Sequence, residues 1–389
     1  MVDKKFWELF AAKYWEKKSV CFKGIKSSIL KIDSDCIFKL LVRYSDHCRK
    51  TKTLVGMKFY IEGHLQYLED VLELLPKAKD KSLMGYHLRM DEMFSDYCLV
   101  CDELIQVLDK EWKLLGEFVM GLYREVGLPS KFAEMGLYLG NYRRTPFGVH
   151  SDGCGVISIP VEGVKEFLVW NSKFVEKNPK LKRTHRYKAY KKDAQRWVAK
   201  PGDLVYWPAS YWHIAESMGS FSATWSIGFW LDEPFSEIVS KAFKPLLVKK
   251  ISDCRTLPMG DFIRQDGLIQ KLPEALELFY SQLAGISHKE IHDVFVRYWL
   301  EIISKNSFRN PPPNLGAKKQ AGVEERIFWA KLSNGNLCVA AKGVLQEVPN
   351  HSKWVKLIQS INEGKLVNLQ FFKRSELKIF QKIYPTNKK

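Results

Sequence analysis

The chain lacks any long apolar run. None of its windows of about 18 residues is free of charged side chains. The start of the chain, MVDKKFWELFAAKYWEKKS, mixes charges with aromatics and contains no apolar leader segment. We therefore expect a soluble cytoplasmic protein with no membrane partner, no membrane-spanning helix and no export signal.

Cysteine is also sparse. The eight cysteines are scattered over 389 residues, and the one close pair, Cys98 and Cys101, has no second CxxC motif to complete a zinc site. This pattern argues against a disulfide framework and favours reduced thiols. Both cysteines fall in YCLVCDELIQVLDKEW, where the spacing of apolar residues predicts an amphipathic helix.

Acidic residues are few in one segment of a chain whose net charge is +17. Residues 173–200, called the basic segment below, contain eleven Lys or Arg and two acids, which accounts for nine of the seventeen excess positive charges. Its aromatic residues alternate with cations, a pattern that favours binding of RNA or an acidic polypeptide. The alternative is a solvated, partly disordered loop.

The periodicity of apolar residues divides the chain into regions. An apolar content of 46% is enough for a substantial core. From about residue 134, short β-type runs punctuated by Gly and Pro predict an antiparallel sandwich or barrel, flanked on both sides by helical patterns. We expect a mainly helical region at 1–130, a β core at 131–240, a helical and candidate dimerisation segment at 241–310, a linker at 311–322 and a small winged-helix-like α+β domain at 323–389.

His150 and Asp152 are candidate metal ligands. They are separated by one residue in GVHSDGCGVISIPVEG, so on a strand their side chains would share a face. His213, in PGDLVYWPASYWHIAES, is the candidate third ligand. Two imidazoles and one carboxylate leave three positions open on the metal, which suits an Fe(II) that also binds a co-substrate and O₂. For each residue alone, the alternative is an ordinary hydrogen-bonded side chain.

Lys165 is a candidate co-substrate ligand. It follows the turn Val161-Glu162-Gly163, and a lysine at that place can point into the mouth of a barrel and pair with a carboxylate of an oxo acid. A solvent-facing lysine at the edge of a strand is the alternative.

Several motifs occur together in the order and approximate spacing of a known family: TPFGVHSD, VEGVKEF, PGDLVYWP, WHIAES and SIGFW. Over roughly residues 134–232 the sequence resembles the JmjC-type, cupin-fold 2-oxoglutarate oxygenases, especially the asparaginyl and ribosomal protein hydroxylases. The resemblance implies an α+β protein with a double-stranded β-helix (jelly-roll, cupin) core, N-terminal helical elements, a following helical segment and a small C-terminal α+β domain.

The resemblance also implies roles for residues of the core. His150, Asp152 and His213 match the catalytic facial triad that binds Fe(II), and Lys165 matches the residue that holds the distal carboxylate of 2-oxoglutarate. Gly228 replaces an Asn of the family's last core strand.

The hydroxyl group that assists Lys165 is not identified by the motif. The asparaginyl hydroxylases have a Thr shortly before the HxD motif, and here the candidates are Thr145, Tyr138 and Tyr142. For contacts with a substrate or partner the candidates are Lys182, Arg183, Arg186 and Trp225.

The expected activity is hydroxylation of an amino-acid side chain in a protein or peptide, with O₂ and 2-oxoglutarate as co-substrates and succinate and CO₂ as products. Expected partners are a protein or peptide substrate, acidic or associated with the ribosome or RNA, and a second copy in a homodimer. Alternatives are the same chemistry on a free amino acid or natural-product intermediate, demethylation of an N-methyl group, and a non-catalytic cupin that binds or regulates.

Overall fold

The structure is a computed structural model. It describes residues 2–54, 56–102, 109–129, 131–218, 220–231, 239–244, 274–305, 326–365 and 369–383. These residues fall into two compact units, unit 1 within residues 1–232 and unit 2 within residues 233–305 and 320–389. The predicted linker at 311–322 lies outside the described residues.

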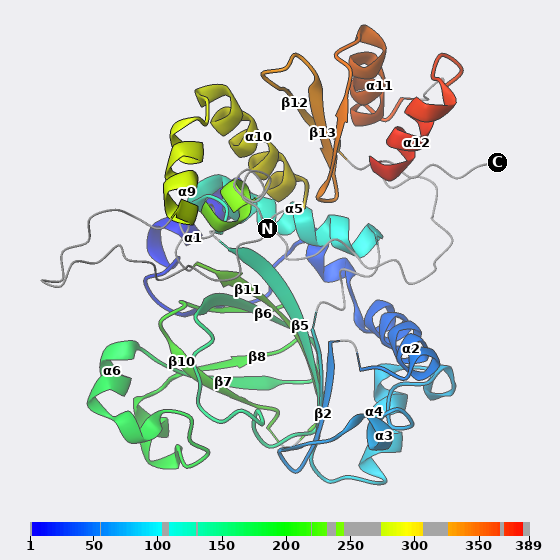
Figure 1. The fold of residues 1–389 in the computed structure, drawn as a ribbon. Coiled ribbons are helices and arrows are strands. Elements are labelled where there is room, and N and C mark those ends of the chain that lie inside the picture. The colour runs from blue at the N-terminus through cyan, green and yellow to red at the C-terminus, as the bar shows by residue number, and fades with distance from the viewer. Residues whose placement is uncertain are drawn as a thin grey trace, which may run out of the picture. The chain divides into compact units, whose positions relative to one another are not determined.

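Unit 1 is built on a large antiparallel sheet (Figure 1). Its strands are, in spatial order, β1 (Val20–Phe22), β9 (Leu204–Trp207), β6 (Cys154–Glu162), β11 (Ser222–Trp230), β5 (Phe132–Gly140), β4 (Tyr97–Asp102), β2 (Met57–Ile61) and β3 (His64–Leu65). A smaller sheet contains β10 (Trp212–Glu216), β7 (Lys165–Trp170) and β8 (Gln195–Ala199).

The two sheets form a jelly-roll core, as predicted. Side chains at even-numbered positions of β5, β6 and β11 point toward the small sheet and line a pocket with residues of β7 and β10. Side chains at odd-numbered positions, among them Leu137, Ile157 and Ile227, are buried on the opposite face. The same strands therefore supply the pocket wall and the main hydrophobic core.

Helices of the N-terminal region cover the opposite face of the large sheet. The helices of unit 1 are α1 (Lys4–Lys13), α2 (Ser34–Thr51), α3 (Leu68–Val71), α4 (Leu83–Asp91), α5 (Asp109–Val126) and α6 (Ser172–Lys177), with 3₁₀ turns η1 (Ser28–Lys31), η2 (Ala78–Asp80), η4 (Pro179–Leu181) and η5 (Lys188–Asp193). Trp7 and Phe10 of α1 join Phe118 and Leu122 of α5 in the main core, which extends across the odd-numbered face of the sheet. Because burial of such large side chains stabilises by about 1.5–3 kcal/mol each, this helical layer holds the pocket-bearing sheet in shape.

The sequence prediction was wrong at Cys98 and Cys101. Both lie on strand β4, which pairs with β2 and β5 in the large sheet, and not on an amphipathic helix. All of β4 except its last residue is buried, so its continuous apolar pattern does not distinguish a buried strand from a helix. Strands β1 to β4 thus extend the sheet from within the N-terminal region.

Unit 2 is an α+β structure. It contains the π-helical turn η6 (Val239–Phe243), helices α9 (Glu274–Ala284), α10 (His288–Ser304), α11 (Ser352–Asn362) and α12 (Arg374–Ile383), and a sheet of β12 (Phe328–Lys331), β13 (Leu337–Ala341) and β14 (Val344–Val348). Trp354 and Ile358 of α11 pack with Val339 of β13, whereas Leu300 of α10 packs with Ala340. The sheet is therefore covered on both faces. The winged-helix and dimerisation assignments, and the predicted domain boundaries, stay predictions.

Within the described residues, no helix is both long enough and apolar enough to cross a membrane.

Candidate active site

The pocket between the two sheets holds the predicted metal ligands. Its walls include Tyr138 of β5, Ser158 of β6, Lys165 of β7 and His213 of β10, and the space between them, including the part open to solvent, is about 710 Å³. Loop residues between β5 and β6, including His150, complete the wall.

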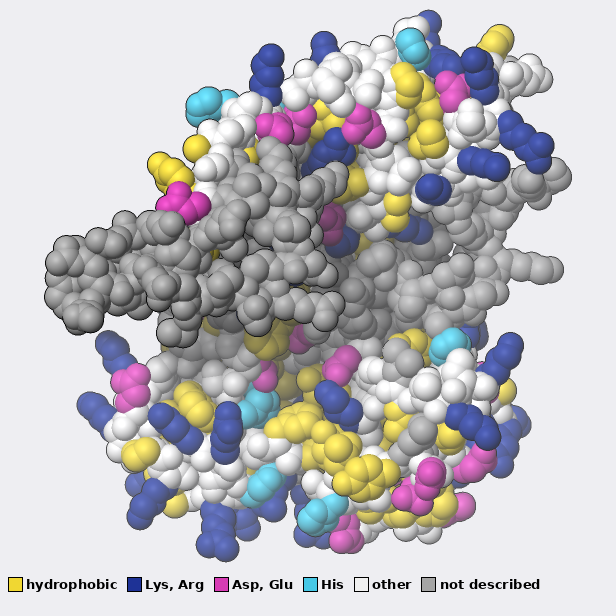
Figure 2. Space-filling model, in the orientation of Figure 1, with side chains coloured by type: hydrophobic (Ala, Val, Ile, Leu, Met, Phe, Trp, Pro, Cys, Tyr) yellow, Lys and Arg dark blue, Asp and Glu magenta, His cyan; other side chains and the backbone are white. Residues whose placement is uncertain are grey.

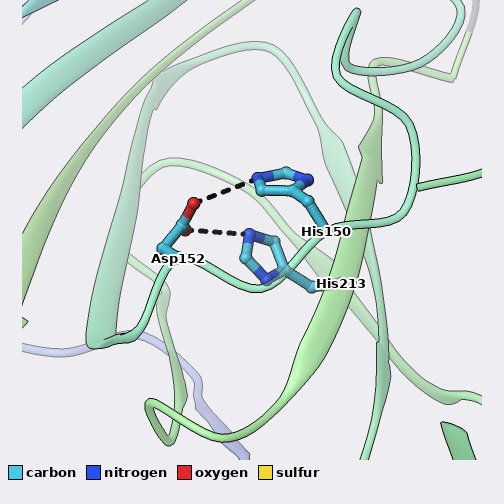
Figure 3. A group of neighbouring side chains, drawn as sticks. All are labelled: His150, Asp152 and His213. Carbon is cyan, nitrogen blue, oxygen red and sulfur yellow. Dashed lines mark ion pairs between the residues drawn. The ribbon is translucent and has the colours of Figure 1, made fainter. Parts of the chain in front are cut away.

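His150, Asp152 and His213 converge at this pocket (Figure 3). Asp152 places one carboxylate oxygen 3.3 Å from Nε2 of His150 and the other 3.4 Å from Nε2 of His213. One potential ligand atom from each residue lies within 4.8 Å of the other two. The side chains that the sequence places 63 positions apart thus meet at one point.

The backbone conformation that brings these side chains together differs from the predicted one. His150 and Asp152 lie in the loop before β6, not on a regular strand. A single β-bridge joins His150 to His213, with N–H to O=C distances of 3.0 and 2.8 Å. The bridge sets the two imidazole rings 4.3 Å apart, centre to centre.

A hydrogen bond shows which ring nitrogen of His150 carries a proton. Its Nδ1 lies 2.9 Å from the carbonyl oxygen of Gly148, and because a carbonyl can only accept, Nδ1 carries the proton. The lone pair is then on Nε2, the atom that faces Asp152. Burial lowers the pKa of His213 well below its ordinary value, so the imidazole of His213 is neutral.

These features fit an iron site. Two neutral imidazoles and a carboxylate on one side of a point are the donor set of non-haem Fe(II), and Nδ1–H bonding to a carbonyl is the usual support of a metal-bound His. Burial raises the pKa of Asp152, a cost that a cation between the three groups would offset.

Lys165 lies at the start of β7, as predicted, and is 2% exposed. Its Nζ is surrounded by aromatic rings, 5.3 Å from the ring centre of Tyr138, 5.1 Å from that of Tyr142 and 5.7 Å from that of Phe167. Among the described residues it has no ion pair and no side-chain hydrogen bond. Burial lowers its pKa to about 8. A buried cation without a carboxylate partner creates a site for an anionic ligand.

The three candidate hydroxyl groups differ in position. Tyr138 and Thr145 line the pocket, and Thr145 Oγ1 also accepts a hydrogen bond of 3.4 Å from the backbone N–H of Ala215. Tyr142 packs with Cys98 and Val100 behind Lys165 and is not among the residues that line the pocket.

Trp225 was wrongly predicted to contact a substrate. It is 1% exposed and lies in the main core, because on β11 the pocket face carries Ser226, Gly228 and Trp230. The one-residue offset reverses the direction of the side chain. Gly228 does lie in the pocket wall, where an added Cβ would come within 3.0 Å of the sulfur of Cys154.

Three aromatic residues that lie around the candidate ligands were not identified from the sequence. The ring of Trp207 lies 4.6 Å from that of His213, and Phe147 lies 5.5 Å from His150 and 5.6 Å from Tyr60. Trp207 belongs to the quoted PGDLVYWP motif, so the strand alternation of that motif was an available signal. The packing of Tyr60 on Phe147 depends on strands far apart in sequence and had no local signal.

The basic segment is folded. Its aromatic residues pack inward: Phe174, Tyr187 and Tyr190 join one cluster with Trp170, and Trp197 joins another. They are therefore not the exposed platforms that the pattern suggested. Lys182, Arg183 and Arg186 are exposed on this segment and do not line the pocket.

Comparisons with known proteins found one family model and similar solved structures. A family model described as JmjC domain matches residues 124–234. Among solved structures, YcfD from Escherichia coli is similar, with a TM-score of 0.49 and 14% identity over 96% of this chain and 93% of that chain. No curated protein matches the sequence.

Two further matches are complexes of the same protein, described as a ribosomal oxygenase from Escherichia coli. The complex with cobalt and 2-oxoglutarate has a TM-score of 0.46 and 14% identity over 96% of this chain and 93% of that chain. The complex with cobalt and succinic acid has a TM-score of 0.45 and 15% identity over 91% and 89%. Residues 124–234, which contain the convergent His and Asp side chains and the buried lysine, thus match the model of the JmjC domain.

Proposed function

We propose that this protein is an Fe(II)- and 2-oxoglutarate-dependent oxygenase that hydroxylates an amino-acid side chain of a protein or peptide. The observation that carries the proposal is the presence, in one pocket, of a two-His, one-carboxylate group and a buried lysine that has no ion-pair partner among the described residues. The first suits Fe(II), and the second suits the far carboxylate of a dicarboxylic oxo acid.

Each residue has a defined task in this proposal. His150, Asp152 and His213 hold the metal, leaving the pocket side open for ligands. Lys165 binds the distal carboxylate, assisted by the hydroxyl of Tyr138 or Thr145. Bound Fe(II) would supply the O₂ chemistry that converts 2-oxoglutarate to succinate and CO₂ and places one oxygen atom in a substrate C–H bond.

Residues around the site orient the two imidazoles and shield Lys165 from water. Trp207 and Phe147 pack against the two imidazoles and restrict their rotation. Tyr138, Tyr142 and Phe167 enclose Lys165 in an apolar setting in which an ion pair with a carboxylate is stronger than in water. No side chain needs to act as a general acid or base.

The test is turnover and binding with the purified protein. With Fe(II), ascorbate and ¹³C-labelled 2-oxoglutarate we expect labelled succinate, and calorimetry with Co(II) in place of iron should show stoichiometric binding of 2-oxoglutarate. Neither result should appear with a His150→Ala/Asp152→Ala variant. Absence of both binding and turnover in the wild-type protein would refute the proposal and favour a non-catalytic cupin.

A second experiment uses mass spectrometry to identify the substrate. Ribosomal proteins, acidic peptides and total protein fractions, the partners predicted above, are incubated with active enzyme and with the double variant. A gain of 16 Da on a peptide that depends on active enzyme supports the proposal. The same gain on a free amino acid alone selects the small-molecule alternative, and release of formaldehyde selects demethylation.

A further inference from the structure

The basic segment presents a dense array of exposed Lys and Arg side chains. Between residues 177 and 192 there are eight Lys or Arg and no acid. One of the eight, Lys191, bridges Glu166 and Glu216 with distances of 3.0 Å to each. The other seven are exposed and make no ion pair with a described residue: Lys177, Lys180, Lys182, Arg183, Arg186, Lys188 and Lys192. We call these seven side chains the cationic surface; Figure 2 shows Lys and Arg side chains gathered over the part of unit 1 that holds α6.

Buried side chains and hydrogen bonds fix the backbone that carries the cationic surface. Leu181 and Tyr187 are buried, the hydroxyl of Tyr187 donates to the carboxylate of Glu216, and the indole N–H of Trp170 donates to the carbonyl of Tyr190 at 3.0 Å. Because the backbone is already ordered, binding a partner costs less conformational entropy than it would on a flexible loop.

The same segment contacts the stretch that precedes the metal ligands. Arg183 N–H donates to the carbonyl of Val149 at 2.8 Å, and Val149 N–H donates to the carbonyl of Thr184 at 2.9 Å. Val149 is the neighbour of His150. A partner bound on the cationic surface therefore lies beside the loop that forms one wall of the pocket.

We propose that the cationic surface binds the phosphate backbone of double-stranded RNA, a function beyond the hydroxylase activity proposed above. The chemistry favours a polyanion over a protein, because residues 177–192 include no exposed large apolar side chain of the kind that protein interfaces use as anchors.

The absence of exposed aromatic residues and of a protruding helix on this surface favours duplex RNA over single strands and duplex DNA. Single-stranded binding relies on aromatic platforms, and the aromatic residues here pack inward. Entry into the major groove of DNA needs a protruding helix or ribbon, whereas α6 has six residues and the other helical turns of the segment are 3₁₀. The wide, shallow minor groove of A-form RNA, bordered by phosphates, can be contacted without such an element.

The experiment measures binding of a fluorescein-labelled 20-base-pair RNA duplex to the full chain by anisotropy between 50 and 300 mM NaCl. The test variant replaces Lys177, Lys180, Lys188 and Lys192 by Gln. The control variant replaces four exposed lysines of unit 1 that make no ion pair with a described residue, Lys26, Lys31, Lys50 and Lys79, by Gln and so has the same net charge.

We expect the test variant to lose about tenfold to a hundredfold in affinity at 100 mM NaCl, with a fall of about three to four in the slope of log K against log salt, since each phosphate contact contributes about 0.9. The control variant should change by less than about threefold, and both variants should keep wild-type 2-oxoglutarate turnover without RNA.

Three results would overturn the proposal. One is equal loss in the two variants, which reduces the effect to net charge. The second is equal affinity for a DNA duplex of the same sequence. The third is tighter binding of a poly-glutamate peptide than of RNA, which would assign the surface to an acidic protein. Normal turnover with failed RNA binding would leave the hydroxylase proposal intact.

Discussion

His150 and His213 are joined through their backbones as well as through the site. Their N–H and C=O groups exchange two hydrogen bonds, so the loop before β6 is tied to β10 at the position of both candidate ligands. The bridge therefore holds the backbones of the two candidate ligands together independently of their side chains. We infer that metal removal leaves the fold of unit 1 intact and lowers its stability only by the lost binding free energy.

The first prediction concerns the ligands themselves. Asp152→Ala should reduce metal content and 2-oxoglutarate-dependent succinate formation by at least about a hundredfold, because it removes the anionic ligand that both imidazoles face. Metal analysis after dialysis and succinate assays are the measurements. Ser151→Ala is the matched control, since Ser151 donates to the carbonyl of Ala209 and is no member of the ligand group; equal losses in both would argue for a folding defect.

The second prediction concerns Lys165→Met. Loss of a charge-assisted bond to the co-substrate should raise the KM for 2-oxoglutarate by about tenfold to a hundredfold, corresponding to about 1.5–3 kcal/mol. Metal content should not change, because Lys165 is not among the three ligands. An unchanged KM would remove Lys165 from the co-substrate site.

The third prediction is a pH dependence of stability. The pKa of Lys165 is about 8 in the folded protein and 10.5 in a free side chain, so between these values the unfolded chain binds more protons. The free energy of unfolding of the metal-free wild type should rise from pH 8 to pH 10.5 relative to Lys165→Met, by up to about 3 kcal/mol, and the difference should be constant below pH 8.

Neighbouring groups do not obscure this titration. Burial raises the pKa of Cys98 to about 12 and the pKa values of Tyr138 and Tyr142 well above 10, so all three stay neutral in the range. Urea unfolding at half-unit pH steps provides the measurement. Parallel curves for wild type and variant would show that Lys165 does not titrate in this range.

The fourth prediction separates core from pocket on β11. Trp225→Ala should destabilise the protein by about 3–5 kcal/mol, because it opens a cavity in the main core, with little change in the KM for 2-oxoglutarate. Trp230→Ala, on the pocket face, should cost less stability and change catalysis more. Thermal unfolding and steady-state kinetics of both variants give the comparison; the reverse pattern would contradict the assignment of faces.

The fifth prediction concerns the anchor of the basic segment. Glu166 is 1% exposed and binds both Lys191 and Arg196. Glu166→Gln should destabilise the protein by about 1 kcal/mol and increase amide exchange in residues 187–196, since a buried carboxylate loses its ion pairs with two partly exposed cations. Glu176→Gln, an exposed acid of the same segment, is the control and should do neither.

The sequence was sufficient for the parts of the site that depend on short-range patterns. The start of β7 at Lys165 and the position of His213 after a Pro-containing turn were predictable, because each depends on strand period or turn chemistry. His150 and Asp152 do converge, but through a loop and a single β-bridge and not through the period of a strand. The β12–β13 hairpin was predictable from Asn334-Gly335 for the same reason.

Other features depended on long-range contacts. Strand β4 looks helical because it is buried on both faces, and only its pairing with β2 and β5 identifies it. The inward direction of Tyr187 and Tyr190 depends on Trp170 and Glu216, which lie on the small sheet. No local pattern within the basic segment could reveal that its aromatic residues form a core while its lysines face solvent.

Strand β11 borders the pocket with one face and the main core with the other, and this alternation limits which sequence changes the strand tolerates. Ser226, Gly228 and Trp230 border the pocket, while Trp225, Ile227 and Phe229 belong to the core, and a shift of one residue along the strand would exchange the two sets. A single-residue deletion in β11 would then place the phenyl ring of Phe229 in the space now left by Gly228, beside Cys154, and expose polar side chains to the helices. Substrate range in this protein can therefore be altered by exchanging side chains on β11, but not by changing the length of the strand.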